Sequence, residues 1–243
     1  MDSVVLSDTS LCAIVRDEKM NSAGGIERFV DSHVPYVEQA IIADTGSIDG
    51  TREILEEMQS KYSNLKVVDV PFNGYSDARN KSLKHVKTKR VLILDADELL
   101  THEKPQNDWK ILSEFIENNY SEACRFFFEQ IYPHKIISDS ISGHTLRLFD
   151  KNIKLHFEND LWEQAEISKK CRLIRIENVL IKHFLPSHES TKLKWENWYL
   201  EDINAKYCAE DRNRVPYWKK ISPSMTEGFS KWKKYNPLRD NYV

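Results

Sequence analysis

An apolar run leads directly into acidic residues in the segment Val91-Leu92-Ile93-Leu94-Asp95-Ala96-Asp97-Glu98. Four consecutive apolar residues at this length predict a short strand that is buried on both faces. Because residues two apart in an extended chain project to the same side, Asp95 and Asp97 can face one ligand. Two neighbouring carboxylates repel each other unless a cation lies between them, and Mg²⁺ and Mn²⁺ prefer oxygen ligands. The segment therefore predicts a strand that ends at a divalent-metal site, with a solvated acidic turn as the alternative.

The residues before this segment alternate between strand-like and helix-like patterns. Apolar runs that are typical of buried strands are found at 11–15, 40–43, 65–70 and 91–94. Helical patterns lie between them, at 26–32, at 51–62 and from Ser76 to about Val86, and Asp49 and Ser76 are the expected helix caps. This alternation predicts βαβ units in an α/β fold with a mostly parallel sheet, which binds ligands at the carboxyl ends of its strands.

Beyond residue 105 the pattern changes to α+β. A helix is expected at 109–118, and strands are expected at 124–131, 145–149, 171–176 and 179–184. From Leu193 to Cys208, apolar residues recur at helical spacing and predict an amphipathic helix. We therefore expect one main domain over 8–185 and a helical extension over 186–243 that packs on it.

The composition is that of a folded protein with little net charge. The 243 residues include 35 basic and 38 acidic side chains, so the net charge of −3 disfavours a general nucleic-acid binder. No apolar run approaches the ~18 residues of a transmembrane helix, and the four cysteines form no CxxC pair. A cytoplasmic protein is expected. The basic, aromatic residues 231–235 are a candidate for contact with a membrane surface, and a solvated terminus is the other interpretation.

Two further turns carry residues that can bind a nucleotide. Asp44 follows the apolar run at 40–43, and Gly46 lies in the turn after it. An acidic side chain there can accept hydrogen bonds from a base or a ribose, although turn chemistry is an alternative. The segment 73–80 forms an expected helix start, where backbone N–H groups favour an anion and Arg79 adds a bidentate donor. A solvated arginine is the alternative at that position.

Four motifs in this order resemble those of the family 2 glycosyltransferases, which have the GT-A fold. The matching stretches are Val15–Glu18, Ala43–Thr51, Gly74–Asn80 and Asp95–Asp97. The resemblance is clear over residues 11–100 and looser over 125–184. It implies a metal-dependent hexosyltransferase that moves a sugar from a nucleoside-diphosphate sugar, with a UDP-sugar as the expected donor and with inversion at the anomeric carbon.

The resemblance also implies roles for individual residues. The nucleotide sugar would be bound by residues from all four motifs, namely Arg16, Glu18, Asp44, Gly46, Arg79, Asp95 and Ala96. Asp97 would bind Mn²⁺ or Mg²⁺, with Asp95 and His183 as further ligands, and the metal would act as a Lewis acid on the leaving nucleoside diphosphate. For His183 an ordinary strand histidine is the alternative, and Arg147 would either neutralise the diphosphate or form a structural ion pair.

The acceptor half departs from the family pattern. Relatives often carry an R-L-F segment, a His-Glu pair and a later histidine; here Arg147–Phe149 and His183 are present, but Trp162 precedes Glu163 in place of histidine. An inverting transfer needs a carboxylate that deprotonates the acceptor hydroxyl. Glu163 is the expected catalytic base and Asp160 the second candidate, and a solvated acidic loop is the alternative for both. The acceptor class stays open among a glycan, a lipid-linked sugar, a protein and a small molecule.

Two other functions remain open at this point. A sugar-nucleotide nucleotidyltransferase would need a glycine-rich, basic loop near its N-terminus, and Gly24-Gly25 is a poor substitute for one. A non-catalytic module that binds the nucleotide sugar is the second, because Trp162 replaces the expected histidine beside the candidate base.

Overall fold

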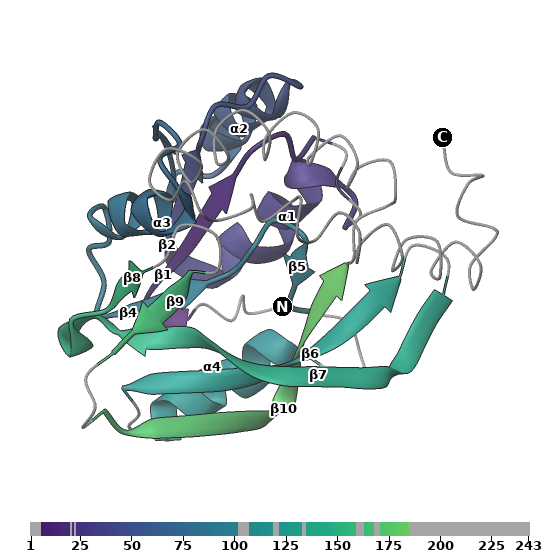
Figure 1. Ribbon diagram of the computed structural model, residues 1–243, viewed down its shortest axis with the longest axis vertical. Helices are drawn as coiled ribbons and strands as arrows, with labels where there is room; N and C mark the ends of the chain where they lie inside the picture. The colour runs from purple at the N-terminus through teal and green to yellow at the C-terminus, as the bar shows by residue number, and fades with distance from the viewer. Residues whose placement is uncertain are drawn as a thin grey trace, which may run out of the picture. The chain divides into compact units, whose positions relative to one another are not determined.

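The N-terminal part of the chain forms parallel strands joined by helices, as the alternating pattern predicts (Figure 1). In chain order the elements are β1 (Leu6–Val15), α1 (Gly25–His33), the short 3-10 helix η1 (Val34–Tyr36), β2 (Val37–Asp44), α2 (Thr51–Lys61), β3 (Leu65–Asp69), α3 (Tyr75–Leu83) and β4 (Arg90–Ile93). Strand β1 pairs in parallel with both β2 and β4, and β2 pairs in parallel with β3. The mostly parallel α/β arrangement is therefore confirmed.

The computed structural model describes residues 6–19, 21, 23–101, 107–118, 122–132, 135–158, 163–167 and 171–184. The chain divides into two units, one made of residues 1–131 and 137–185 and the other of 132–136 and 186–243. Nearly all described residues belong to the first unit. The helix expected at 193–208, and the whole of the expected extension, lie outside the described residues.

The remaining elements complete an eight-stranded sheet and add a small second one. They are β5 (Glu98–Leu99), α4 (Asp108–Asn118), β6 (Ala123–Tyr132), β7 (Lys135–Asp150), the 3-10 helix η2 (Lys151–Ile153), β8 (His156–Glu158), β9 (Gln164–Glu166) and β10 (Leu173–Phe184). The strand order of the large sheet is β3-β2-β1-β4-β7-β6-β10-β5. Strand β7 is antiparallel to β4, β10 is parallel to β6, and β5 is antiparallel to β10.

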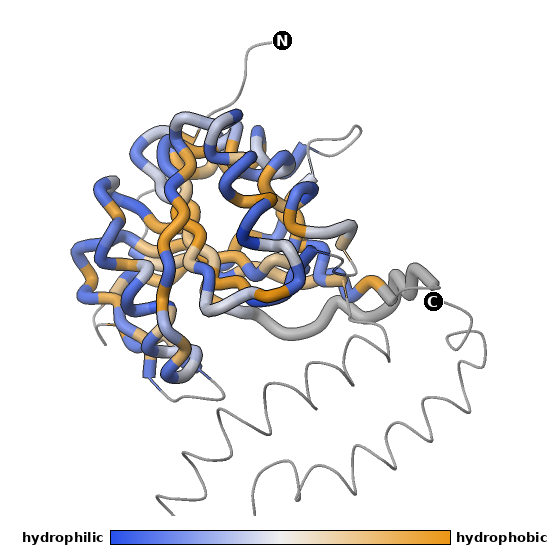
Figure 2. The backbone as a smooth tube through the Cα atoms, turned by 90° about the horizontal axis from the view of Figure 1, so that it is seen from above, coloured by the Kyte–Doolittle hydropathy of each residue, from blue (hydrophilic) through white to orange (hydrophobic). Residues whose placement is uncertain are grey.

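The apolar side chains form cores on the two faces of the sheet. Ile42 of β2 packs in one core with Phe29 of α1 and Trp109 of α4, whereas its neighbour Ile41 packs in another with Phe149 of β7. Successive residues of a strand face opposite sides, so a strand covered on both faces reads as a continuous apolar run. Figure 2 shows the hydrophobic residues along the central strands and mixed hydropathy along the helices.

Several predicted boundaries differ from the structure. Strand β7 begins ten residues before the strand expected at 145–149, and β1 begins five residues before the one expected at 11–15. The two strands expected at 171–176 and 179–184 are one strand, β10, whose register with β6 shifts between Ile176 and Leu180. Ile176 and Val179 are both buried although they are three residues apart, and a bulge is what allows this in a period-two strand. Helix α3 begins at Tyr75 after Gly74, whose φ of 109° suits glycine, and it ends at Leu83 rather than near Val86.

The small sheet, β8 with β9, is held against helix α3. Asn80 of α3 donates from Nδ2 to the carbonyl of Phe157 at 2.8 Å, and the N–H of Phe157 donates to Oδ1 of Asn80 at 2.8 Å. This paired contact places β8 next to α3, as Figure 1 also shows, and with it the start of β9. Among the described residues, no helix combines the length and the apolar character that crossing a membrane requires.

Candidate active site

The turns singled out in the sequence meet at the carboxyl edge of the sheet. Val15, at the end of β1, lies opposite Asp44, at the end of β2, and the N–H of Leu94 donates to the carbonyl of Cys12 on β1 at 3.2 Å. Because all three strands run in the same direction, Arg16, Asp44 and Asp95 leave the sheet at the same edge. The parallel sheet thus brings together residues that are up to 79 positions apart, which is the separation of Arg16 from Asp95.

The two carboxylate oxygens of Asp44 have different surroundings. Oδ1 accepts hydrogen bonds from the N–H groups of Gly46 at 2.7 Å and Ser47 at 2.8 Å, which is the turn chemistry expected here. Oδ2 is buried without a hydrogen-bond partner among the described residues. A buried acceptor without a partner costs free energy, and a ligand N–H or O–H would satisfy it. Asp44 can therefore hold its own turn and bind a ligand at the same time.

The loops around Asp44 are linked to one another by further hydrogen bonds. The N–H of Glu18 donates to Oγ1 of Thr51 at 2.8 Å, which joins the loop after β1 to the start of α2. Nδ2 of Asn21 donates to the carbonyl of Ala96 at 2.8 Å, which joins the same loop to the acidic segment after β4. The guanidinium group of Arg16 lies 5.9 Å from the ring centre of Phe72. Arg16, Glu18 and Ala96 therefore lie at the same edge as Asp44.

Two arginines hold the carboxylate of Asp95. Arg79 donates from Nη2 to Oδ1, and Arg147 donates from Nη2 to Oδ2 at 3.0 Å. Burial raises the pKa of Asp95, but the two guanidinium groups lower it by more, so its pKa lies well below the ordinary range. Arg79 is only 5% exposed, which rules out the solvated-arginine interpretation. Asp95 is thus a fixed anion at neutral pH.

Glu98 is a member of this cluster that the sequence reasoning missed. It is 2% exposed, its Oε1 accepts a hydrogen bond from Nη2 of Arg147, and its Oε2 accepts one from the N–H of Asp95 at 3.0 Å. Burial raises the pKa of Glu98 to about 7, because the opposing effect of Arg147 is outweighed by burial together with Asp95 and Asp97. The only signal in the sequence was a glutamate directly after the two aspartates, before the apolar pair Leu99-Leu100.

Asp97 and His183 face each other across the pairing of β5 with β10. Oδ2 of Asp97 lies 3.7 Å from Nε2 of His183, and the N–H of Phe184 donates to the carbonyl of Asp97 at 2.9 Å. Burial lowers the pKa of His183, but the nearby carboxylates of Asp97, Glu98 and Asp95 raise it by more, so the net shift is upward. The His183 side chain therefore faces an acidic partner, while its ring packs edge-on against Phe128 of the core.

This pair fits a divalent cation in part. The two atoms that would hold an ion, Oδ2 of Asp97 and Nε2 of His183, lie 3.7 Å apart. Both oxygens of Asp95 are bonded to arginine, and within the described ranges no group of three His, Cys, Asp or Glu residues could hold a metal. Mg²⁺ and similar ions commonly fill their remaining positions with water and phosphate oxygens. Asp97 and His183 thus suit an ion whose remaining ligands would be water and the phosphate oxygens of a bound molecule.

Glu163 joins the cluster from the other side of Arg79. Nε and Nη2 of Arg79 each lie 2.9 Å from Oε1 of Glu163, and the Glu163 side chain is 20% exposed. The Glu163 side chain is therefore paired rather than solvated. Glu163 also lines a cavity of about 450 Å³, together with Arg79, Arg125, Thr145, Leu146, Arg147, Phe157, Gln164 and Ala165. Asp160 and Trp162 lie outside the described residues.

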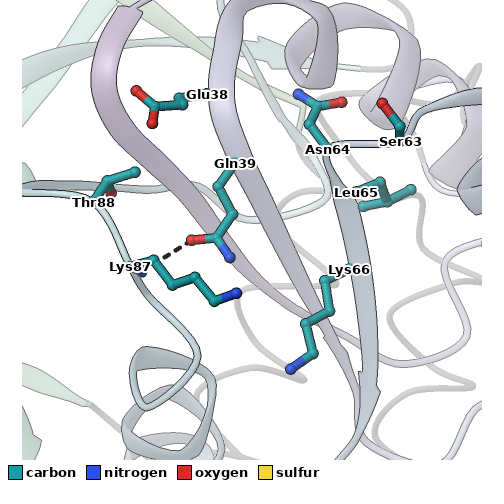
Figure 3. Close-up of a pocket in the computed structure, with 8 residues that line it drawn as sticks. All are labelled: Glu38, Gln39, Ser63, Asn64, Leu65, Lys66, Lys87 and Thr88. Atoms are coloured by element: carbon teal, nitrogen blue, oxygen red, sulfur yellow. Dashed lines mark hydrogen bonds between the residues drawn. The ribbon is translucent and has the colours of Figure 1, made fainter.

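A second cavity lies at the opposite edge of the sheet. It has a volume of about 360 Å³ and is lined by Glu38, Gln39, Ser63, Asn64, Leu65, Lys66, Lys87 and Thr88 (Figure 3). Gln39 lies near the start of β2, whereas Asp44 ends that strand. Oε1 of Gln39 accepts a hydrogen bond from the N–H of Lys87 at 3.0 Å. Ligands of parallel sheets bind at the carboxyl ends of the strands. This cavity is therefore separate from the site around Asp95 and Glu98.

Residues 20–173 match the family described as Glycosyl transferase family 2. That match covers more than half of the chain. The chain belongs to this family. No curated protein sequence is a significant match.

Solved structures of glycosyltransferases share the fold of this family 2 chain. The structure of Staphylococcus aureus TarS 1–349 in complex with UDP-GlcNAc matches with a TM-score of 0.56 at 15% identity, over 76% of this chain and 60% of that one. The mannosyltransferase PcManGT from Pyrobaculum calidifontis, in complex with GDP-Man and Mn²⁺, matches with a TM-score of 0.53 at 17% identity, over 88% and 67%. The chain thus spans about 60% of the length of the TarS fragment. At these identities the likeness shows the fold alone.

The pKa of Glu98 predicts how the stability of this family 2 protein depends on pH. In the metal-free protein, its pKa rises from 4.5 to about 7, so the folded state keeps a proton that the unfolded state has released. The contribution of this proton to the unfolding free energy is complete below pH 4.5. It declines by up to about 3 kcal/mol as the pH rises to 7. The raised pKa of His183 adds a loss of stability in the same direction above pH 6.5.

Urea unfolding with EDTA at pH 5, 6.5 and 8 measures how the unfolding free energy changes with pH, and Glu98→Gln should flatten this slope. An unchanged slope in that variant would contradict the assignment.

Proposed function

We propose that the protein transfers a sugar from a nucleoside-diphosphate sugar to an acceptor hydroxyl, in a metal-dependent reaction that inverts the anomeric carbon. The observation that carries this proposal is the position of Arg79. Its buried guanidinium group joins Asp95, which opens the acidic segment after β4, to Glu163, which lines a cavity. One side chain therefore connects the expected donor half of the site to the expected acceptor half.

The donor nucleotide binds at the carboxyl edge, where Asp44 accepts a hydrogen bond from the base through Oδ2. The burial of that oxygen without a partner among the described residues supports this role. Arg16, Glu18, Gly46 and Ala96 surround the same opening, as their contacts with the neighbouring loops indicate. A UDP-sugar is the donor that we propose, and the unfolding experiment below compares it with the other nucleotides.

Asp97 and His183 would hold Mn²⁺ or Mg²⁺. When bound, the ion supplies a Lewis acid that stabilises the charge of the leaving diphosphate. The separation of 3.7 Å between the two ligand atoms supports this position. Asp95 becomes a ligand only if Arg79 or Arg147 releases one of its oxygens, so its first role is to hold the two arginines in place.

Glu163 accepts the proton of the acceptor hydroxyl. Both nitrogens of Arg79 bond to Oε1, and Oε2 has no hydrogen-bond partner among the described residues. As the acceptor oxygen forms its bond to the anomeric carbon, the bond from that carbon to the diphosphate breaks, the proton passes to Oε2, and the nucleoside diphosphate leaves with the electron pair. Arg79 orients the carboxylate for this step. Asp160 is the alternative base.

Family membership favours sugar transfer over nucleotidyl transfer, and the remaining alternative is a module that binds the donor without turnover. Hydrolysis of the donor sugar in the absence of an acceptor separates the two, because a binding module would release no sugar. The same assay with Asp97→Ala shows whether release depends on the proposed metal ligand.

Nucleotide binding is tested by thermal unfolding with UDP, GDP, CDP and dTDP, each with and without Mn²⁺. A ligand at 100 times its dissociation constant adds about 2.7 kcal/mol to the unfolding free energy, which raises the midpoint by roughly 5–10 °C for a chain of this size. We expect this rise for UDP only when Mn²⁺ is present, and we expect Asp97→Ala to abolish the metal dependence. If no nucleotide raises the midpoint, the proposed function is wrong.

A further inference from the structure

We propose that the acceptor carries a phosphate group, which binds beside Arg125 in the cavity next to Glu163. This inference rests on the proposed function, because it assigns the chemistry of the acceptor at the same site. The cavity of about 450 Å³ falls within the usual range for small-molecule sites. Its lining includes three arginines and a single carboxylate, that of Glu163.

The three arginines differ in what compensates their charge. Arg79 bonds to Asp95 and Glu163, and Arg147 bonds to Asp95 and Glu98. Arg125 has no carboxylate partner within the described part of the chain, and its Nε is buried there without a hydrogen bond. A buried donor left unsatisfied costs about 1–3 kcal/mol, and more when the group is charged. An anionic ligand would remove this cost.

The neighbouring strand increases the need for an anion. Arg125 of β6 lies opposite Arg175 in the parallel pairing with β10. Like charges that are directly opposite on adjacent strands destabilise a sheet. The guanidinium group of Arg175 lies 5.8 Å from the ring centre of Phe127, and its side chain is exposed. The sheet therefore places two cations side by side: Arg175 is exposed, whereas Arg125 is half-buried and its Nε is fully buried.

The position of the cavity favours the acceptor over the donor. Its lining contains the proposed base, Glu163, but neither Asp44 nor the Asp97–His183 pair, which belong to the donor side. Thr145 and Gln164 supply neutral hydrogen-bonding groups for hydroxyls, and Phe157 supplies an apolar surface. Arginine binds phosphate through parallel N–H donors, which makes it the suitable side chain for this group. The lining thus fits a phosphorylated sugar or polyol whose hydroxyl reaches Glu163.

The test is thermal unfolding of the full chain saturated with UDP and Mn²⁺, so that the donor site is filled. The probes are sn-glycerol 3-phosphate and inorganic phosphate, with glycerol as the neutral match. We expect both phosphate compounds to raise the midpoint and glycerol to leave it unchanged. Arg125→Gln should weaken the apparent affinity for sn-glycerol 3-phosphate at least tenfold, and Arg125→Lys should retain part of it.

Arg175→Gln is the matched control, because it removes the neighbouring charge without touching the cavity, and it should keep the affinity. Arg125→Gln is expected to fold, since it relieves the repulsion from Arg175, and its midpoint without probes is the reference. Binding that is unchanged in Arg125→Gln, or lost equally in Arg175→Gln, would overturn the proposal. A chain that UDP and Mn²⁺ do not stabilise at all would instead refute the proposed function, so the two failures are distinguishable.

Discussion

Glu163→Gln should lower kcat for sugar transfer by about 10²–10⁴-fold, the usual contribution of a general base, and leave the donor KM within a factor of about three. The amide has nearly the shape of the carboxylate and can still accept a hydrogen bond from Arg79 at the Oε1 position, which the native pair occupies at 2.9 Å. It cannot take up the proton of the acceptor. Steady-state kinetics with a saturating acceptor measure both constants.

Glu166→Gln is the matched control for this experiment. Glu166 ends β9, is exposed, and lies three residues from Glu163, so its replacement should leave kcat unchanged. Full turnover in Glu163→Gln would remove Glu163 as the base and make Asp160 the candidate. A loss of the folded state is detected separately, because the unfolding midpoint of the variant with UDP and Mn²⁺ should match that of the native protein.

Arg79→Met should destabilise the protein by about 3 kcal/mol at pH 7, which lowers the unfolding midpoint by roughly 6–12 °C. Removing one partner of a buried ion pair weakens the compensation of the other charge. Without Arg79, Asp95 would keep only Arg147, and Glu163 would have no cationic partner among the described residues. The lowered pKa of Asp95 sets the pH dependence. Its stabilisation is present above the ordinary pKa of 3.8 and is lost as the pH falls, so the difference between the two proteins should shrink below about pH 4.

Arg52→Met provides the comparison for a surface ion pair. Arg52 bonds to Asp69 and Glu56, whose side chains are mostly exposed, and such pairs contribute about 1 kcal/mol or less. Urea unfolding of the two variants at pH 7 and pH 4 measures the contrast. If Arg79→Met costs no more than Arg52→Met, the cluster around Asp95 does not stabilise the fold in the way described here.

The parts of the fold that could be predicted are those in which the residues of one segment alone indicate its structure. The apolar run at 91–94 is continuous because β4 is covered on both faces, and the polar residues after it mark the carboxyl edge. Likewise Asp44, Gly46 and Ser47 form their turn from adjacent residues. The break between 176 and 179 was misread as two strands, because a bulge interrupts the period of two without ending the strand.

The members of the candidate site that were missed depend on partners from distant segments. Glu98 follows Asp97 and reads as part of an acidic turn. It becomes the buried partner of Arg147 only because β7 places that arginine, 49 positions away in the chain, beside it. Arg125 reads as one of several polar residues in a strand until its neighbours are known. Its lack of a carboxylate partner among the described residues is a property of the packed sheet, which no local pattern expresses.

The amino-acid sequence by itself determined the alternation of strands and helices, the edge of the sheet that carries the polar residues, and the family to which the chain belongs. These follow from periodicity and turn chemistry, which act between residues near one another in the chain. Only the tertiary structure decided that Arg79 bonds both to Asp95 and to Glu163, which is 84 positions from Arg79, and that Asp97 meets His183. Charge compensation and the pKa shifts depend on burial and on distances of a few ångströms, and those exist only after the strands have packed.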